Sequence, residues 1–159
     1  MNYFQKVTYT QYANDVGGDA DLHAEYEAIK LPARATSGSA GYDFFAPCDI
    51  SLSPGESIKI PTGIRVCLDA DAFLMCVPRS GLGFKHRIGM DNTVCIVDQD
   101  YFFSDNEGHI HCKLHNGGDH DVFIPRGSAY MQGIILPYLL TVDDDATGVR
   151  NGGFGSTGW

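Results

Sequence analysis

The stretch PGESIKIPTGIRVCLDADAFLMCVPRSGLG, residues 54–83, decides the fold class of this chain. It contains three short apolar runs, SIKI, IRVCL and FLMCV, and each run is followed by a turn that contains Pro, Gly or Asp. Strands of about four to eight residues that alternate with such turns are typical of a β-sandwich or β-barrel. Similar runs follow further along the chain: TVCIV, HIHCKL, DVFI and GIILPYLL. We therefore predict an all-β fold.

Length and composition narrow the class further. The chain has 159 residues, 43% of them hydrophobic and 19% charged, with 19 Gly and 7 Pro. These values suit one turn-rich globular domain and exclude a coiled coil or a disordered chain. The net charge of −9 argues against nucleic-acid binding, and no apolar run is long enough to cross a membrane. The N-terminus lacks a secretory signal pattern, so we expect a cytoplasmic or otherwise intracellular protein.

Three parts of the chain differ in composition. Residues 1–28 form an N-terminal extension, and its first twelve residues, rich in Tyr, Val and Thr, suit an extra strand. Residues 29–142 carry the regularly spaced apolar runs and form the expected β domain. Residues 143–159 are first acidic and then glycine-rich, which predicts a flexible C-terminal arm. Because the arm isolates Phe154 between glycines, we expect it to act as a lid that closes an active site. The alternative is a disordered terminus.

Two segments combine residue types that bind phosphate or activate water. PRSGLG, 78–83, follows an apolar strand, and its glycines would let backbone N–H groups approach an anion; the alternative is an ordinary tight turn. NTVCIVDQDY, 92–101, places Asn92 before a short strand and Asp98 after it. An amide such as Asn92 offers both a donor and an acceptor to a base edge, whereas a hairpin with polar ends is the alternative explanation. A third segment, SAGYDFFA, 39–46, places Asp43 after a glycine turn, but by itself it is more simply explained as a structural turn.

The five cysteines are odd in number and include no CxxC pair, so we expect reduced thiols. The alternative is a zinc cluster. His109 and His111 would lie on one face of a strand and Cys112 on the other, which does not favour a single site. The candidate ligands are His109, His111, Cys112, His115 and His120.

Five segments, in this order, resemble the trimeric dUTP diphosphatase (dUTPase) family from about Ile29 to Gly158. They are AGYD (40–43), PRSGLGFKH (78–86), NTVCIVDQDY (92–101), the region around GSAYMQGII (127–135) and RNGGFGSTG (150–158). Each segment alone is modest evidence, but five in register are highly specific. The resemblance implies a distorted jelly-roll barrel or sandwich that assembles as a homotrimer. It also implies active sites that are shared between subunits and closed by the arm, residues 143–159.

The same resemblance implies hydrolysis of dUTP to dUMP and diphosphate, which would control the dUTP level and supply dUMP for thymidylate synthesis. Asp98 would activate the attacking water, and Arg79 and Gln132 would assist. The cofactor would be Mg²⁺, held by substrate phosphates and water without a direct protein ligand, with Asp43 at most in its outer shell. The implied substrate-binding residues are Arg79, Ser80, Gly81, Asn92, Val97, Asp98, Tyr101, Gln132, Arg150, Phe154, Gly155, Ser156 and Thr157.

Several features depart from the family pattern. In the fifth motif Val149 holds the place of the usual Arg, and Arg150 follows it. The segment FFSDNEG, 102–108, lengthens the hairpin of the third motif, and Cys95 replaces a small glycine near the expected base pocket. Two alternative functions follow. A dCTP deaminase-like enzyme would share the fold but use a Glu base and lack the arm, so Asp98 and Phe154 argue against it. A nucleotide-binding protein would use the 102–108 insert for protein interaction or signalling.

Overall fold

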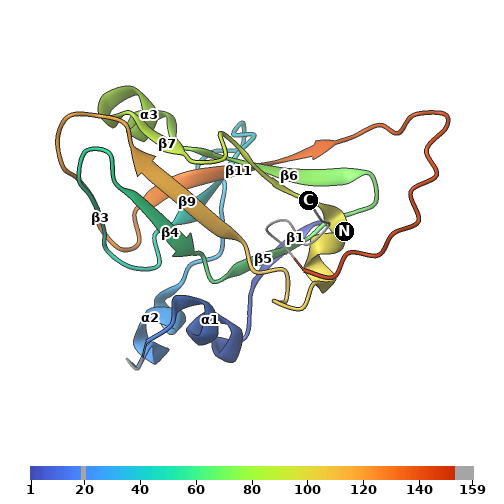
Figure 1. The fold of residues 1–159 in the computed structure, drawn as a ribbon, viewed down its shortest axis with the longest axis horizontal. Coiled ribbons are helices and arrows are strands. Elements are labelled where there is room, and N and C mark those ends of the chain that lie inside the picture. Colours follow the sequence, from blue (N-terminus) through green and yellow to red (C-terminus); the bar gives the residue numbers. More distant parts are fainter. Residues whose placement is uncertain (19–20, 153–159) are drawn as a thin grey trace.

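Short antiparallel strands make up most of the regular structure described, and three short α-helices and one 3₁₀ helix lie at its periphery (Figure 1). The computed structural model describes residues 1–18 and 21–152. The strands are β1 (Tyr3–Lys6), β2 (Tyr42–Phe45), β3 (Ile50–Leu52), β4 (Ser57–Pro61), β5 (Ile64–Cys67), β6 (Ala72–Pro78), β7 (Ile88–Met90), β8 (Cys95–Val97), β9 (His111–Asn116), β10 (Val122–Ile124) and β11 (Ala129–Pro137). The helices are α1 (Tyr9–Val16), α2 (His23–Ala28), α3 (Ser80–His86) and the 3₁₀ helix η1 (Gln99–Phe103).

The strands pair in four antiparallel groups around one core. The largest sheet has the order β2-β11-β6-β8, and the second has the order β4-β9-β7. Two further pairs are β1-β5 and β10-β3. Several strands alternate between inward and outward side chains, as in β3, where Ile50 and Leu52 are buried and Ser51 is exposed. Antiparallel sheets with one apolar face pack in this way, and the inward side chains of the groups form one core.

The apolar runs of the opening stretch are strands, as predicted. Residues 57–61, 64–67 and 72–78 form β4, β5 and β6. The extra strand predicted for the first twelve residues is present as β1, but it is short. It ends at Lys6, and the Thr8 side chain caps helix α1 by accepting a hydrogen bond from Gln11 N.

The segment PRSGLG is neither a glycine-rich loop nor a tight turn. Arg79 is extended, and its carbonyl accepts hydrogen bonds from the N–H groups of Leu82 and Gly83. Helix α3 therefore begins at Ser80 in spite of its two glycines, and it ends where Arg87 adopts a left-handed conformation. The prediction missed this helix because glycine lowers helix propensity, whereas here the neighbouring strands determine the local structure.

The N-terminal residues pack against the β structure rather than apart from it. Strand β1 pairs with β5, and helix α1 contacts β4. Tyr12 of α1 is buried, and its hydroxyl donates to Glu25 of α2 at 2.5 Å. The Tyr26 hydroxyl donates to the Val7 carbonyl at 2.8 Å. These bonds hold both helices at the lower end of the molecule in Figure 1.

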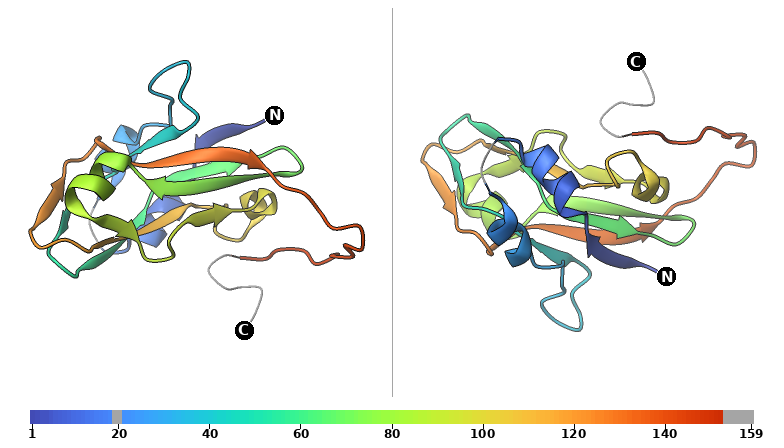
Figure 2. Two further views of the ribbon diagram at one scale, coloured as in Figure 1. Left: turned by 90° about the horizontal axis from the view of Figure 1, so that it is seen from above. Right: turned by 90° about the horizontal axis from the view of Figure 1, so that it is seen from below.

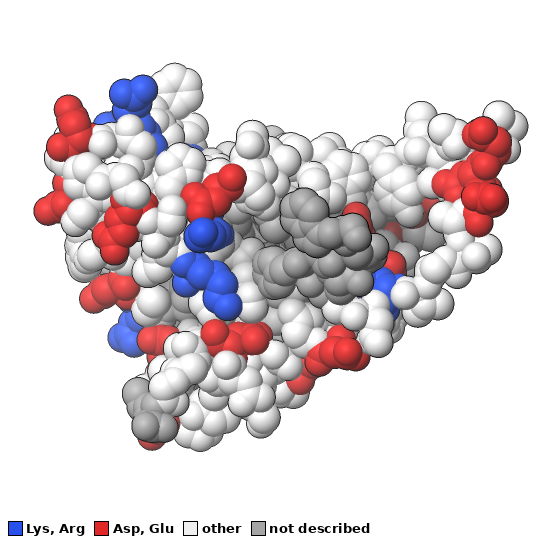
Figure 3. Space-filling view, viewed as in Figure 1, with Lys and Arg blue, Asp and Glu red and all other residues white. Residues whose placement is uncertain are grey.

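Beyond β11, the chain from residue 138 to residue 152 leaves the sheet without regular structure and returns toward η1 (Figure 2). None of the helices in residues 1–18 and 21–152 has the length and apolar character needed to cross a membrane. On the face in Figure 3, basic side chains form small groups among acidic ones.

Candidate active site

A pocket of about 220 Å³ lies beside β8. The third predicted motif supplies most of its wall, and the arm supplies Arg150. The lining residues are Asn92, Cys95, Ile96, Val97, Asp98, Tyr101, Ile110, His111 and Arg150. The structure therefore brings together five of the residues that sequence reasoning assigned to substrate: Asn92, Val97, Asp98, Tyr101 and Arg150.

Backbone geometry at the end of β8 positions Asp98 and Tyr101. Asp98 is extended and begins η1, and its carbonyl accepts a hydrogen bond from Tyr101 N at 3.2 Å. The Tyr101 hydroxyl donates to the His109 carbonyl at 2.9 Å and accepts from Asn106 at 2.7 Å. Burial raises the pKa of Tyr101, so the phenol stays neutral. The ring is thus a fixed wall of the pocket.

The charged groups of the pocket belong to β8, η1 and the arm. The Asp98 side chain is 49% exposed, and its carboxylate pairs with the Arg150 guanidinium. Arg150 Nε also donates to Asp100 Oδ1 at 2.8 Å. The arm therefore reaches the pocket of its own chain in this structure, whereas the resemblance implied an arm that closes a shared site. Asp98 combines a partly solvated carboxylate with a cation that neutralises it.

A second group of predicted residues lies at another part of the main sheet. Gln132 on β11 is directly opposite Asp43 on β2. Arg79 Nε lies 3.4 Å from Asp43 Oδ1. Gly41 lies beside them: a Cβ at this position would lie 2.6 Å from Gln132 Oε1, so the Gln132 amide would have to shift. Ser80, exposed, opens α3 directly after Arg79.

The two groups are separated along the sheet. Strands β11 and β6 lie between β2 and β8, so the outer strands are roughly 14 Å apart at the usual strand spacing. None of Asp43, Arg79 and Gln132 lines the pocket beside β8. One chain thus holds the predicted residues in two separate groups, which are called half-sites below. The remaining predicted residues, Phe154, Gly155, Ser156 and Thr157, lie outside the described part of the chain.

Comparison with known proteins decides the family. The dUTPase family profile matches residues 27–158. The deoxyuridine 5'-triphosphate nucleotidohydrolase of Lactococcus lactis subsp. lactis is 38% identical over 133 residues, covering 82% of this chain and 89% of that protein. The protein of the same name from Shigella sonnei is 39% identical over 136 residues, covering 80% and 87%. This chain belongs to the dUTPase family.

Solved dUTPases have the same fold. The dUTPase from Streptococcus mutans superposes with a TM-score of 0.68 at 29% identity, over 87% of this chain and 97% of that one. The dUTPase from phage phi11 of Staphylococcus aureus superposes with a TM-score of 0.67 at 15% identity, over 94% and 98%. The second match bears on the fold alone. The prediction of an all-β fold of the dUTPase type is confirmed.

The 102–108 insert of this dUTPase packs against β5 and the N-terminal residues. The Arg65 guanidinium lies 3.6 Å from the centre of the Phe102 ring and donates to the Phe102 carbonyl at 2.5 Å. The Glu107 carboxylate accepts hydrogen bonds from Thr8 N at 2.8 Å and Thr8 Oγ1 at 2.6 Å. The insert also reaches the arm, because Ser104 Oγ lies 3.5 Å from the Gly152 carbonyl oxygen. It therefore links Tyr101 to both ends of the chain.

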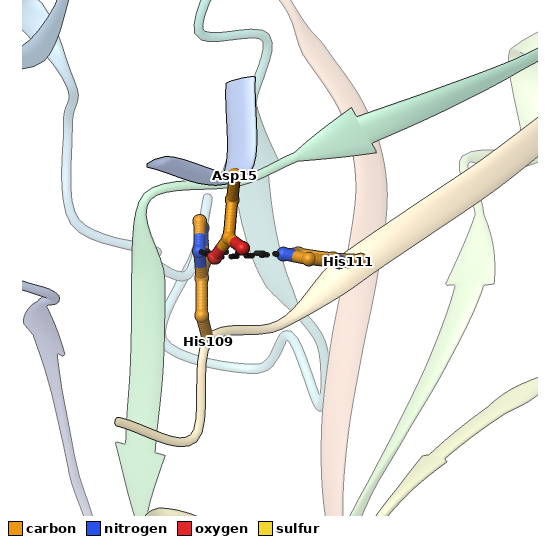
Figure 4. A group of neighbouring side chains, drawn as sticks. All are labelled: Asp15, His109 and His111. Carbon is orange, nitrogen blue, oxygen red and sulfur yellow. Dashed lines mark hydrogen bonds and ion pairs between the residues drawn. The ribbon is translucent and has the colours of Figure 1, made fainter. Parts of the chain in front are cut away.

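Beneath the pocket lies a buried cluster that the sequence analysis did not assemble (Figure 4). Asp15 of α1 points between His109 and His111, and the three ligand atoms lie within 4.8 Å of one another. Asp15 Oδ2 is 2.5 Å from His109 Nδ1 and 3.2 Å from His111 Nε2. Gln11 also donates to Asp15, at 2.8 Å. The N-terminal helix thus contacts a residue, His111, that lines the pocket beside β8.

Hydrogen bonds, rather than a metal ion, account for this cluster. His109 Nε2 accepts the Gly63 N–H at 2.8 Å, so the ring proton is on Nδ1 and faces Asp15. A metal ion on Nδ1 would require a proton on Nε2, where it would oppose the Gly63 donor. Burial lowers the pKa of His109 to about 4, against the opposing effect of Asp15. Burial raises the pKa of Asp15, but hydrogen bonds from Gln11 and His109 outweigh it, and the net shift is downward.

The zinc ligand set considered from the sequence is wrong as a set. His109 and His111 do converge, but Cys112 is buried in the core of the domain. His115 pairs with Asp91 at 3.2 Å, and His120 pairs with Asp119 at 2.6 Å. Sequence reasoning missed Asp15 because it is remote from the histidines in the chain. The only available signal was the His-x-His alternation.

Proposed function

We propose that this chain hydrolyses dUTP to dUMP and diphosphate. The observation that carries the proposal is the pocket beside β8, in which Asn92, Val97, Asp98 and Tyr101 meet within the segment that matches the dUTPase family. Composition supports it, because a polyphosphate substrate needs a few placed cations rather than a basic surface.

Asp98 is the residue that we assign to water activation. Its carboxylate is half-exposed at the pocket, so it can accept a proton from a water molecule that attacks the α-phosphorus. The bond from the α-phosphorus to the bridging oxygen breaks, and the diphosphate leaves with the electron pair of that bond. Arg150 pairs with this carboxylate in the structure, so the cation lies next to the group that would accept the proton.

The walls of the pocket suit a deoxynucleoside. Asn92 offers an amide for the base edge, and Val97 adds a buried apolar surface. The Tyr101 ring is held by two hydrogen bonds and cannot move aside for a larger sugar. We assign the exclusion of a ribose 2′-hydroxyl to Tyr101, since a fixed wall discriminates by shape.

We assign binding of the substrate triphosphate to the second half-site and the arm. Arg79, Ser80, Gly81 and Gln132 offer a cation, a hydroxyl, a backbone N–H and an amide. Arg150 and the glycine-rich end of the arm, with Phe154, Gly155, Ser156 and Thr157, would cover the γ-phosphate and the base.

We assign Mg²⁺ as the cofactor, bound to substrate phosphates and water. Mg²⁺ prefers oxygen ligands and retains several waters, so the phosphate oxygens of the substrate and water can bind it without a direct protein ligand. The cluster of Asp15, His109 and His111 is rich in nitrogen and buried, so it does not suit Mg²⁺. When bound, the ion would offset negative charge on the leaving diphosphate.

A homotrimer with shared sites explains the two half-sites. Asp43 lies on the strand at the opposite edge of the sheet from β8, and neither Asp43 nor Gln132 lines the pocket beside β8 of the same chain. Rotational symmetry places one half-site of each subunit against the other half-site of its neighbour. We therefore propose that three copies of the chain complete three active sites.

The test is diphosphate release from dUTP, dCTP, dTTP and UTP with Mg²⁺, for the natural chain and for Asp98→Asn. We expect selective hydrolysis of dUTP, and a loss of turnover of roughly a thousandfold or more in Asp98→Asn with dUTP binding retained. The matched control is Asp100→Asn, because Asp100 is equally exposed and also pairs with Arg150. Near-normal turnover in Asp98→Asn would remove Asp98 as the base, and ammonia release from dCTP would contradict the proposed reaction.

A further inference from the structure

Two of the five thiols face each other across the strands that form the pocket. Cys76 on β6 is directly opposite Cys95 on β8, so the two side chains lie on the same face of the sheet. Directly opposite residues of an antiparallel pair have Cα atoms about 4.5–5.5 Å apart, which lies within the range that a disulfide spans. The two sulfurs are therefore placed to bond without a large movement of the backbone.

The surroundings of the two thiols differ. Cys76 is fully buried in the core, whereas Cys95 is partly exposed and lines the pocket beside Asn92 and Asp98. A small reagent that enters the pocket meets Cys95 and not Cys76. The hydrogen bond from Cys76 lowers the pKa of Cys95, which increases the share of the reactive thiolate.

The other three cysteines do not combine access to the pocket with a thiol on the facing strand. Cys112 is buried, and burial raises the pKa of its thiol. Burial also raises the pKa of Cys48. Cys67 is partly exposed, but it lies on β5, opposite Tyr3 of β1, and has no cysteine across the strand pair. All five cysteines lie in the described part of the chain, and of these Cys95 alone has both pocket access and a facing thiol.

We propose that Cys95 and Cys76 form a reversible disulfide in the wall of the pocket when the chain meets a peroxide. The Cys95 thiolate attacks one oxygen of hydrogen peroxide, the O–O bond breaks, and a sulfenic acid and, after protonation, water are formed. The Cys76 thiol then attacks the Cys95 sulfur, loses its proton, and displaces a second water. Two thiols are oxidised, one peroxide is reduced to two waters, and a thiol reductant reverses the change.

A nucleotide in the pocket should slow this oxidation, because it would cover Cys95. This part of the inference rests on the proposed function, whereas disulfide formation itself does not. dUMP is the suitable probe since it is the product of the proposed reaction and is not consumed.

The experiment treats the full chain with hydrogen peroxide and follows intact mass and peptide maps. We expect a loss of about 2 Da, a linked peptide that contains Cys76 and Cys95, and recovery with dithiothreitol. In Cys95→Ser, the mass loss of about 2 Da should not occur. Cys76→Ser should instead leave a Cys95 sulfenic acid that a cyclic 1,3-diketone traps, and Cys67→Ser is the control that retains the disulfide.

Three outcomes would overturn the proposal. These are an unchanged loss in Cys95→Ser, a linked peptide that joins other cysteines, and irreversible oxidation of Cys95 without a disulfide in the natural chain. The dUMP arm is run at concentrations where calorimetry shows binding. Failure of dUMP to bind would count against the proposed function, whereas bound dUMP without protection would contradict access through the pocket.

Discussion

Asp15 shows how one residue of the N-terminal helix reaches the floor of the pocket. Its carboxylate accepts hydrogen bonds from Gln11 and His109, and His111 lies within 3.2 Å. His109 in turn accepts the Gly63 N–H. Such a buried network is favourable only when each member finds its partner, and it fixes the protonation state of every group in it.

The network predicts a dependence of stability on acidity. The pKa of His109 is about 4 in the folded chain and 6.5 in the unfolded chain, so the unfolded chain binds more protons between these values. Stability is therefore complete above pH 6.5 and is lost as the pH falls toward 4, by roughly 3 kcal/mol. The lowered pKa of Asp15 acts in the same direction. Urea unfolding at several pH values measures this loss.

Two variants distinguish this cause from general acid unfolding. His109→Gln should flatten the pH profile between pH 6.5 and 4, although it also lowers stability at neutral pH. His120→Gln is the control, because that side chain is 62% exposed and should leave the profile unchanged. Equal profiles for the natural chain and His109→Gln would contradict the assignment.

At the scale of elements, the turn that ends the 102–108 insert requires a glycine at position 108. Gly108 has a φ of +70°, and a Cβ there would lie 2.6 Å from the Tyr101 carbonyl oxygen and 2.7 Å from Phe102 Cα. Both contacts are with backbone, which cannot move without shifting η1. The turn that returns the chain to β9 therefore closes tightly over the element that carries Tyr101.

We expect Gly108→Ala to lower the free energy of unfolding by more than the cost of a left-handed alanine, which is about 1–2 kcal/mol. The extra loss arises because the methyl group would displace the backbone at Tyr101. Gly55→Ala is the matched control, with a φ of +79° and nothing within 4 Å of its Cβ. Equal losses in the two variants, measured by denaturant unfolding, would show that the close backbone contact has no effect.

At the scale of the whole molecule, the two half-sites lie on different strands of one sheet. Asp98 follows β8, whereas Arg79 pairs with Asp43 of β2. A single chain that served as the complete enzyme would need all of them in one pocket. The separation is the reason to expect an assembly in which neighbouring subunits complete each site.

Mixing two inactive variants tests shared sites. Asp98→Asn impairs one half-site and Arg79→Ala the other, so each alone should be inactive. After equal mixing through unfolding and refolding, we expect about a quarter of the natural activity, because that share of sites receives both intact halves. A mixture as inactive as its parts would contradict sites shared in this way. Mixing without unfolding is the control, in which the assemblies stay separate.

The fold class and most of the lining of the pocket beside β8 could be predicted from the amino-acid sequence. Short apolar runs between turns specify antiparallel strands, and Asn92, Val97, Asp98 and Tyr101 lie close together in the chain, so their proximity needs only a local hairpin. Helix α3 could not be predicted this way, because its glycines disfavour the helix that the surrounding strands impose.

Only the tertiary structure decided which distant residues meet. Asp15 lies far from His109 and His111 in the chain, and Cys76 is opposite Cys95 because β6 pairs with β8 in one register. Strand order also separates Asp43 from the pocket beside β8. These pairings depend on sheet order and register, which are set by packing of the whole core and not by local periodicity.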